Sequence, residues 1–400
     1  MDKKYLPHLL YFITFIAVSI PVACGYICEG GIVIQWIARV DEIASGLSHG
    51  QLLLFPSEEI ALSTAGAVNA LHSNLWLFLP GLVYLLTDSI VLSYQFYVLL
   101  IQLGTLLFSI MMFRRLFDDK VSVFFGVLLY MTCPYRIYIC YDEANLMQAV
   151  FWALLPLYVW AVLGVVKGIR TYQNIIWTAL VLALMGYADG IMLLVVTGFT
   201  IIAIIFSKKP SLLLSIVVGI IAFLPGATRL IQYLMSDAFL DLQISLQSIM
   251  PKGYTIGQFF TSYAYLPGTP GLGLGLLISL AACVWLYFAA GQIKMQKDCR
   301  FFTAISLILI IMSLKLFPWD IFQRAGSVFL KLIPLIQTPA VFFGLACFAL
   351  CVPAAFAIGK LYKNSNKAIA VGIPVIVLFS SIGLAIYLCN TLTYYRLPIQ

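Results

Sequence analysis

The sequence has very few charged residues for its length. Of its 400 residues only 10% are Asp, Glu, Lys or Arg, whereas 62% are hydrophobic. A soluble domain typically has about 25% charged and about 45–50% apolar residues. Too little polar surface is present to cover a water-exposed globule, so the composition predicts an integral membrane protein.

The sequence also lacks the patterns of several catalytic and metal-binding classes. The nine cysteines form no CxxC pair and no Cys/His cluster with zinc spacing, and the three histidines are isolated. No P-loop, GxSxG, HExxH or dinucleotide-binding pattern has a supporting context. We expect no disulfide framework and no cofactor, and the need for a divalent metal stays open. The basic residues form no single patch, so we do not expect nucleic-acid binding.

Long apolar runs are abundant instead. A helix of about 20 apolar residues crosses the hydrocarbon core of a membrane, and we identify eleven such runs. They cover approximately 9–27, 90–113, 120–135, 147–166, 175–187, 189–206, 211–231, 271–291, 301–317, 338–358 and 368–388. The shorter run 75–87 predicts a helix that dips into the outer leaflet. The sequence therefore predicts an all-α polytopic transmembrane bundle that forms one domain over residues 1–400.

The distribution of Lys and Arg predicts the orientation of these spans. If the N-terminus is cytoplasmic and the spans alternate, 15 of the 23 basic residues but only 4 of the 16 acidic residues lie in inner loops. The C-terminus is then extracellular. The long polar loops, 28–88, 232–270 and 317–337, all lie outside. Because loops carry sites, we expect a plasma-membrane protein that acts at its outer face.

The first outer loop contains an amphipathic helix. The apolar residues of the segment recur every three or four positions, as in a helix lying on the membrane. They are Ile34, Ile37, Val40, Ile43, Ala44 and Leu47. Arg39, Asp41 and Glu42 are candidates to face a site, although a solvated polar face is the plainer interpretation for Glu42. Glu29 caps the first span beside two glycines.

The second outer loop is rich in tyrosine and carries the adjacent carboxylates Asp142 and Glu143. Four polar or aromatic residues after it have helical spacing and predict one stripe on the following helix. They are Tyr141, Asn145, Gln148 and Trp152. The stripe has two open interpretations, a substrate site or hydrogen bonding between helices. We interpret Asp189 as a turn residue.

In these segments the chain resembles the bacterial YfhO-type membrane proteins of the GT-C superfamily of polyprenyl-phosphate-sugar-dependent glycosyltransferases. Four stretches carry the resemblance. They are 36–47 with Gly50 and Gln51; Leu79, Pro80 and Tyr84; 133–136 with Asp142, Gln148 and 155–157; and 317–319 with 336–339.

The resemblance implies transfer of a sugar from a polyprenyl-phosphate donor to a glycan or lipid acceptor of the cell envelope. It implies that Glu29 or Asp41 is the base that activates the acceptor and that Asp142 is a second carboxylate. Arg39 and Arg324 would contact the donor phosphate. A carboxylate removes the acceptor proton, and cations stabilise the leaving phosphate. Further candidates for substrate binding lie in the same loops: Tyr135, Arg136, Tyr141, Glu143, Asn145, Gln148, Trp319 and Gln337.

The chain departs from the family pattern at several positions. Ile32 stands where an aspartate is expected, Gln148 where a glutamate is expected and Val341 where an arginine is expected. The large outer C-terminal domain of the family is also not found. Two other functions therefore stay open, a non-catalytic assembly partner and a transporter or flippase for a lipid-linked saccharide. The near absence of charge within the spans argues against an ion-coupled carrier.

Overall fold

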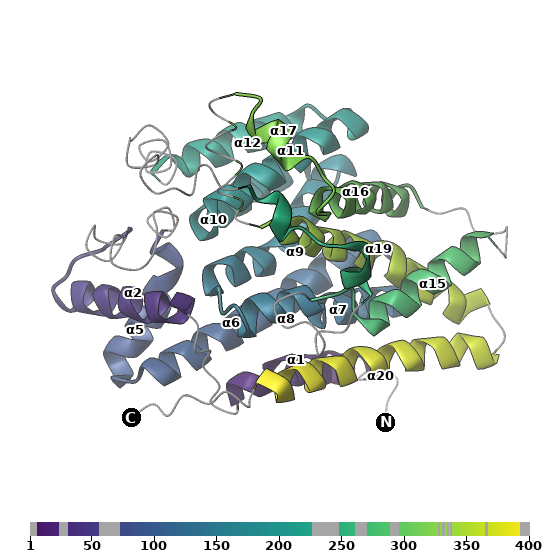
Figure 1. Cartoon of the computed structure of the whole chain (residues 1–400), viewed down its shortest axis with the longest axis horizontal. Coiled ribbons are helices and arrows are strands. Elements are labelled where there is room, and N and C mark those ends of the chain that lie inside the picture. The colour runs from purple at the N-terminus through teal and green to yellow at the C-terminus, as the bar shows by residue number, and fades with distance from the viewer. Residues whose placement is uncertain are drawn as a thin grey trace.

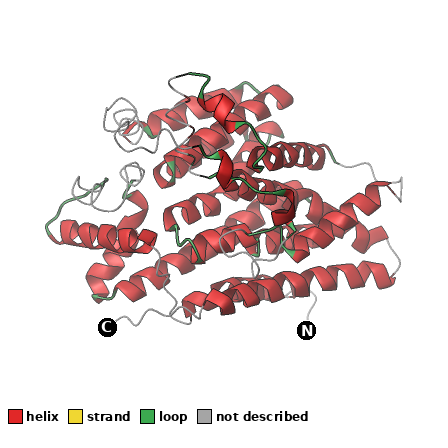
Figure 2. Ribbon diagram, in the orientation of Figure 1, coloured by secondary structure: helices red, strands yellow, loops and turns green. Residues whose placement is uncertain are grey.

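The computed structural model describes residues 6–23, 31–55, 73–225, 248–260, 270–288, 296–326, 329, 333, 336, 338–364 and 367–392. Every regular element in these ranges is a helix (Figure 2), and the one β-type contact in them is an isolated bridge between Tyr254 and Leu314. The prediction of an all-α fold is therefore confirmed for this part of the chain.

The helices lie along one another as a bundle, with α2 and α5 at the left edge of Figure 1 and α15 at the right edge. The α-helices are α1 Leu6–Ala23, α2 Gly31–Ser48, α5 Phe78–Thr87, α6 Ile90–Leu116, α7 Lys120–Met131, α8 Pro134–Tyr141, α9 Leu146–Val166, α10 Thr171–Ala188, α11 Gly190–Ser207, α12 Ser211–Ala222, α15 Leu274–Phe288, α16 Lys297–Ser313, α17 Trp319–Gln323, α19 Ala340–Asn364 and α20 Lys367–Leu392. Short 3₁₀ helices are η1 Leu75–Leu77, η3 Met250–Lys252 and η4 Ile256–Phe259.

Four of the described helices are long and apolar enough to cross a membrane, namely α6, α9, α19 and α20. A fifth span results if the bent pair α7 and α8 is counted as one. Each of the eleven predicted runs does contain a helix, but several of these helices are shorter than a full span. The chain thus has helices that could span a membrane, and the number eleven stays a prediction.

The predicted run 120–135 is not one straight helix. α7 ends at Met131, α8 begins at Pro134, and the two helices are bent by about 40° at this break. Pro134 occupies the first turn of α8, where its missing N–H is tolerated. The break matters for the site because it turns the residues of α8 away from the axis of α7.

Side-chain caps fix where several helices begin. The oxygens of Asp119, Asn145 and Asp189 accept hydrogen bonds from the backbone N–H groups three residues later, at 2.8, 3.2 and 2.9 Å. Such a cap satisfies one of the N–H groups that the first turn of a helix leaves without a partner. The prediction that Asp189 is a turn residue is confirmed, since it ends α10 and caps α11.

α19 is the central helix of the bundle. All of its most apolar window is buried, against 28% of the corresponding window of α20 at the edge. Many buried positions of α19 carry small side chains, among them Gly344, Ala346, Cys347 and Ala354. Small residues let neighbouring helices approach closely, and α7, α15, α16 and α20 all pack against α19.

The amphipathic helix predicted around residues 34–47 is confirmed as α2, and Gly50 ends the following turn with a positive φ of 72°. Of its apolar residues, Val40 and Ile43 are buried against the bundle, whereas 62% of the surface of Ile34 is exposed. α2 packs on α5 where Gly81 leaves room for Ile43. Leucines on the other face of α5 are exposed: Leu79, Leu82, Leu85 and Leu86.

Candidate functional site

The segments that connect the helices lie in two groups, one at each end of the bundle. The first, called the α2 end, comprises α2, η1, the α8–α9 connection and the α10–α11 corner. There the Trp76 indole N–H donates to the Leu184 carbonyl on α10 at 3.0 Å. Gln95 Nε2 donates to the last turn of α1, at the Val22 carbonyl, over 3.1 Å. The first bond ties the segment after Asn74 to α10, and the second ties α6 to α1.

The buried face of α2 carries a cation. Arg39 is only 5% exposed, and its Nε and Nη2 donate to Asn74 Oδ1 at 2.9 and 2.6 Å. One turn earlier, Trp36 packs against the ring of Tyr97 on α6 with 6.2 Å between centroids. We call Trp36, Arg39, Asn74 and Tyr97 the Arg39 cluster. It joins three segments that are well separated in the sequence.

The Arg39 cluster contains buried donors without partners. Trp36 Nε1, Asn74 Nδ2 and the Tyr97 hydroxyl have no hydrogen-bond partner among the described residues. All three side chains are more than nine-tenths buried. Buried polar groups are nearly always hydrogen-bonded, so each such exception needs an explanation. Three donors beside a guanidinium make a site suited to an anion.

Burial acts on the charge of this cluster. It lowers the pKa of the Arg39 guanidinium to about 10, while the carboxylate charge of Glu42 opposes the shift. Arg39 thus stays cationic at neutral pH. A cation shielded from water interacts with an anion more strongly than an exposed one does.

The two carboxylates of α2, Asp41 and Glu42, lie on different faces of this helix. Glu42 Oε2 is buried and its charge acts on Arg39, whereas Asp41 is exposed. The structure therefore does not bring Asp41 together with the Arg39 cluster. Glu29, the other predicted base, lies outside the described residues.

An acidic corner lies between α8, α9 and α11. It consists of Asp142 and Glu143 after α8, Asn145 at the start of α9 and Asp189 at the start of α11. The Asp142 and Glu143 N–H groups both donate to the Tyr138 carbonyl, at 2.9 and 3.0 Å, which folds the connection tightly. Ala144 completes it with a positive φ of 50°.

Glu143 is the most perturbed carboxylate of this corner. Burial raises the pKa of Glu143 to about 7, a hydrogen bond with Asn145 opposes the rise, and the nearby charges of Asp142 and Asp189 add to it. A carboxylate with a pKa near neutrality can both accept and return a proton.

The prediction that Tyr141, Asn145, Gln148 and Trp152 share one face of a single helix is wrong. Tyr141 ends α8, and Asn145 caps α9 from outside the helix. Only Gln148 and Trp152 of the four therefore lie within α9. The left-handed Ala144 interrupts the 100° periodicity, and spacing alone did not indicate this interruption.

Arg136 and Tyr141 belong to a buried network between helices. Arg136 Nη1 donates to Gln102 Oε1 on α6 at 2.7 Å, and Nη2 donates to the Met131 carbonyl at the α7 break at 2.6 Å. Gln102 Nε2 donates to the Tyr141 hydroxyl, which donates to the Val18 carbonyl of α1. The network ties α1, α6 and α8 together. It supports the interpretation of hydrogen bonding between helices for these two residues.

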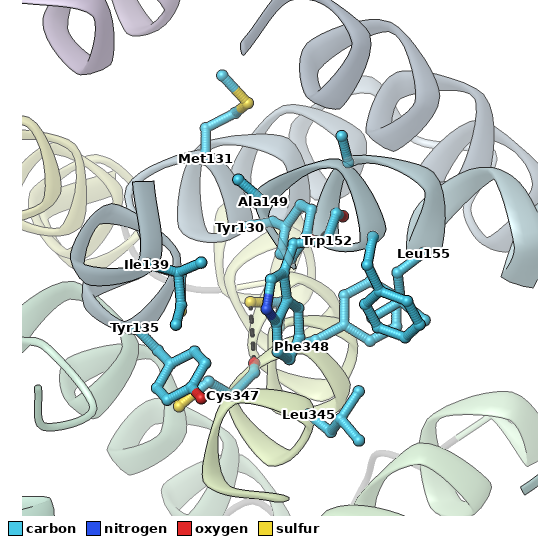
Figure 3. Packing of buried hydrophobic residues seen from close by; sticks show 14 of the residues in the cluster. Tyr130, Met131, Tyr135, Ile139, Ala149, Trp152, Leu155, Leu345, Cys347 and Phe348 are labelled. Carbon is cyan, nitrogen blue, oxygen red and sulfur yellow. Dashed lines mark hydrogen bonds between the residues drawn. The ribbon is translucent and has the colours of Figure 1, made fainter. Parts of the chain in front are cut away.

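Tyr135 lies in the packed core beside this network. Its ring meets the Trp152 ring edge-on at 5.4 Å, and both rings lie close to α19 (Figure 3). The absence of a side chain at Gly344 makes room for both rings, because a Cβ there would collide with Tyr135 and crowd Trp152. Tyr135 is 2% exposed, so packing accounts for this side chain.

The segment 317–337 contributes less to the site than predicted. Trp319 is buried, donates its indole N–H to the Met312 carbonyl at 3.0 Å and stacks on Phe342. Arg324 is exposed at the end of α17. Gln337 lies outside the described residues.

Sequence analysis missed Asn74, Tyr97 and Gln102 and gave Asp189 only a role in a turn. Gln102 lies deep within an apolar run, and such a polar residue is itself a signal. Asn74 and Tyr97 carry no comparable signal, because their roles arise from contacts with α2.

Among the described residues, no group of three or more His, Cys, Asp or Glu side chains is arranged to hold a metal ion. Comparison with known proteins found no matching family model and no matching curated protein.

Proposed function

We propose that the chain is an integral membrane glycosyltransferase-like protein that moves a sugar from a polyprenyl-phosphate donor to a glycan or lipid acceptor at the outer face. The observations that carry the proposal are a buried cationic donor cluster and a carboxylate whose pKa burial raises to about 7, in segments linked by the hydrogen bond from Trp76 to Leu184. Transfer from a lipid phosphate needs both functions.

The Arg39 cluster would hold the donor phosphate. Its guanidinium and its three unpartnered donors supply a charge and hydrogen bonds, and a phosphate provides acceptor oxygens for them. These groups are oriented by α2, η1 and α6 before any ligand enters. Fixed donors stabilise the negative charge that develops on a departing phosphate.

The acidic corner would act on the acceptor. Glu143, with Asp142 beside it, would remove the proton of the acceptor hydroxyl as its oxygen attacks the anomeric carbon. That carbon gives up the phosphate oxygen with the bonding electrons. Asn145 and Asp189 hold the two helices that frame Glu143.

Sugar transfer from radiolabelled polyprenyl-phosphate sugars by the purified protein tests the proposal. We expect transfer by the wild type and a strong reduction in Asp142→Asn and Glu143→Gln. The exposed Asp41→Asn variant is the matched control. Undiminished transfer in both corner variants would contradict the role of the acidic corner.

The departures from the family pattern favour a second candidate, a non-catalytic assembly partner. Asp41 is exposed, and the aspartate expected in the first loop is replaced by Ile32. A wild type that binds the donor through Arg39 but transfers no sugar with any donor would favour this candidate.

A further inference from the structure

A cavity of about 190 Å³ lies between α9, α11, α16 and α19, away from the α2 end. Its walls are almost entirely apolar and include Leu155, Val159, Phe199, Ala203 and Ile305. For comparison, an apolar cavity of about 150 Å³ stays dry and takes up small hydrocarbons. The space therefore suits an apolar ligand.

The cavity is elongated parallel to the helices. Along α16 its lining extends from Lys297 to Leu309, and along α9 from Val166 back to Leu155. Twelve residues of helix correspond to roughly 18 Å. A ligand that fills this length is a chain lying parallel to the spans, as lipid tails do.

One end of the cavity is closed and the other is open. At the closed end Leu155, Leu309 and Leu345 are nearly fully buried, and Figure 3 shows Leu155, Leu345 and Phe348 in this packed region. At the open end Phe206 is 68% exposed and Lys297 is exposed. A ligand would therefore enter beside Lys297.

The open end belongs to the second group of connections, called the basic end, which comprises the α6–α7 and α9–α10 connections, the start of α16 and the end of α19. There Asp298 is paired with Lys167 at 3.0 Å. Lys297 has no ion-pair partner among the described residues, and Lys208 follows the lining residue Ser207. The net charge at the mouth is positive, which is complementary to a phosphate.

We propose that this cavity holds one chain of an anionic phospholipid, with the lipid phosphate against Lys297. The site is separate from the Arg39 cluster and does not depend on the proposed transferase activity. The apolar wall binds the chain and the lysine selects the head group. A zwitterionic lipid with the same chains would gain less at the mouth.

Native mass spectrometry of the full-length, delipidated protein tests the proposal. The probes are dioleoyl phosphatidylglycerol, dioleoyl phosphatidylcholine and glycerol 3-phosphate. We expect one retained phosphatidylglycerol per chain and roughly a fivefold preference over phosphatidylcholine, the effect of one cation near a membrane surface. Lys297→Gln should abolish the preference, and Lys252→Gln, an exposed lysine near η3, should leave it unchanged.

Ala203→Phe should fill the cavity and abolish retention of both lipids, whereas Val217→Phe on the exposed face of α12 should not. If Ala203→Phe does not stay monodisperse, Ser207→Phe at the mouth replaces it. Equal retention of the two lipids by the wild type would overturn the proposal, as would undiminished retention in the filled variant. Binding of glycerol 3-phosphate as tight as that of the lipid would also overturn it. Sugar transfer is measured separately, so the two proposals fail independently.

Discussion

The arginines at the two ends of the bundle have different surroundings. At the basic end, Arg115 Nη1 donates to the Trp160 carbonyl at 2.6 Å and to Asn174 Oδ1 at 2.9 Å, and the guanidinium lies 3.8 Å from the centroid of the Trp160 ring. Lys167 donates to the Arg115 carbonyl and pairs with Asp298. At the α2 end, the Arg39 cluster keeps three buried donors without a described partner.

This difference indicates that Arg115 stabilises the fold, whereas the Arg39 cluster is suited to binding a ligand. A buried donor without a partner costs about 1–3 kcal/mol, so three of them oppose folding unless a ligand uses them. The guanidinium of Arg115 meets protein acceptors and an aromatic ring, so it stabilises the fold directly. The contrast teaches that an arginine is better judged by the groups around its guanidinium than by its burial alone.

Replacing Arg39 should have the largest effect on the difference between the two ends. In Arg39→Met the α2 end loses its cation, and we expect sugar transfer to fall by about 10²–10³-fold, as when a donor to a developing anion is removed. Arg324→Met, an exposed arginine on α17, is the control and should stay within about twofold of the wild type. Steady-state transfer kinetics measure both, and equal losses would contradict a specific role for Arg39.

Glu143→Gln should reduce transfer by about 100-fold, the usual contribution of a general base. Transfer by the wild type should rise as pH increases through about 7, because the carboxylate form of Glu143 accepts the proton. The variant should lose this rise. A pH profile that is the same in both proteins would exclude Glu143 as the base.

Arg115→Met should sharpen the contrast by affecting stability and not transfer. The loss of charged hydrogen bonds and of the ring contact should lower the free energy of unfolding by about 1.5–3 kcal/mol. Thermal unfolding in detergent measures the corresponding fall in Tm. Arg170→Met is the control at the same end, since Arg170 is exposed; a Tm equal to that of this control would remove the stabilising role of Arg115.

The pKa of Glu143 also predicts a smaller effect on stability. Because the folded-state pKa is about 7 and the ordinary value is 4.5, the folded protein binds the proton more tightly between these values. The free energy of unfolding should therefore fall as pH rises from about 4.5 to about 7 and change no further through this group above it. Glu143→Gln should show a shallower decline in Tm over this range, and an unchanged slope would contradict the assignment.

Asp41→Asn should have the smallest effect, within about twofold on transfer and about 0.5 kcal/mol on stability, because surface substitutions rarely exceed this. Kinetics and thermal unfolding in the same buffers check both values. A large loss of transfer would return Asp41 to the place that the family resemblance implies for it.

Much of the fold could be predicted because its causes are local. Apolar runs indicated the helices, and residues such as Asp189 marked where helices begin. The break after Met131 was missed because it lies within one apolar run, and the left-handed Ala144 was missed because helical spacing does not indicate a positive φ. Among the predicted site residues, Arg39 and Glu143 lie in polar clusters, whereas Arg136 and Tyr135 pack within the bundle.

The amino-acid sequence by itself determined that several helices are long and apolar enough for a membrane, that the fold is helical, and that α2 is amphipathic. Composition and periodicity suffice for these properties because they act over a few residues. Tertiary structure alone decided that Asn74 would meet Arg39 across 35 positions of the chain, and that Glu143 would be buried among other carboxylates. Hydrogen bonds and desolvation depend on which distant groups share a space, and packing of the whole bundle determines that.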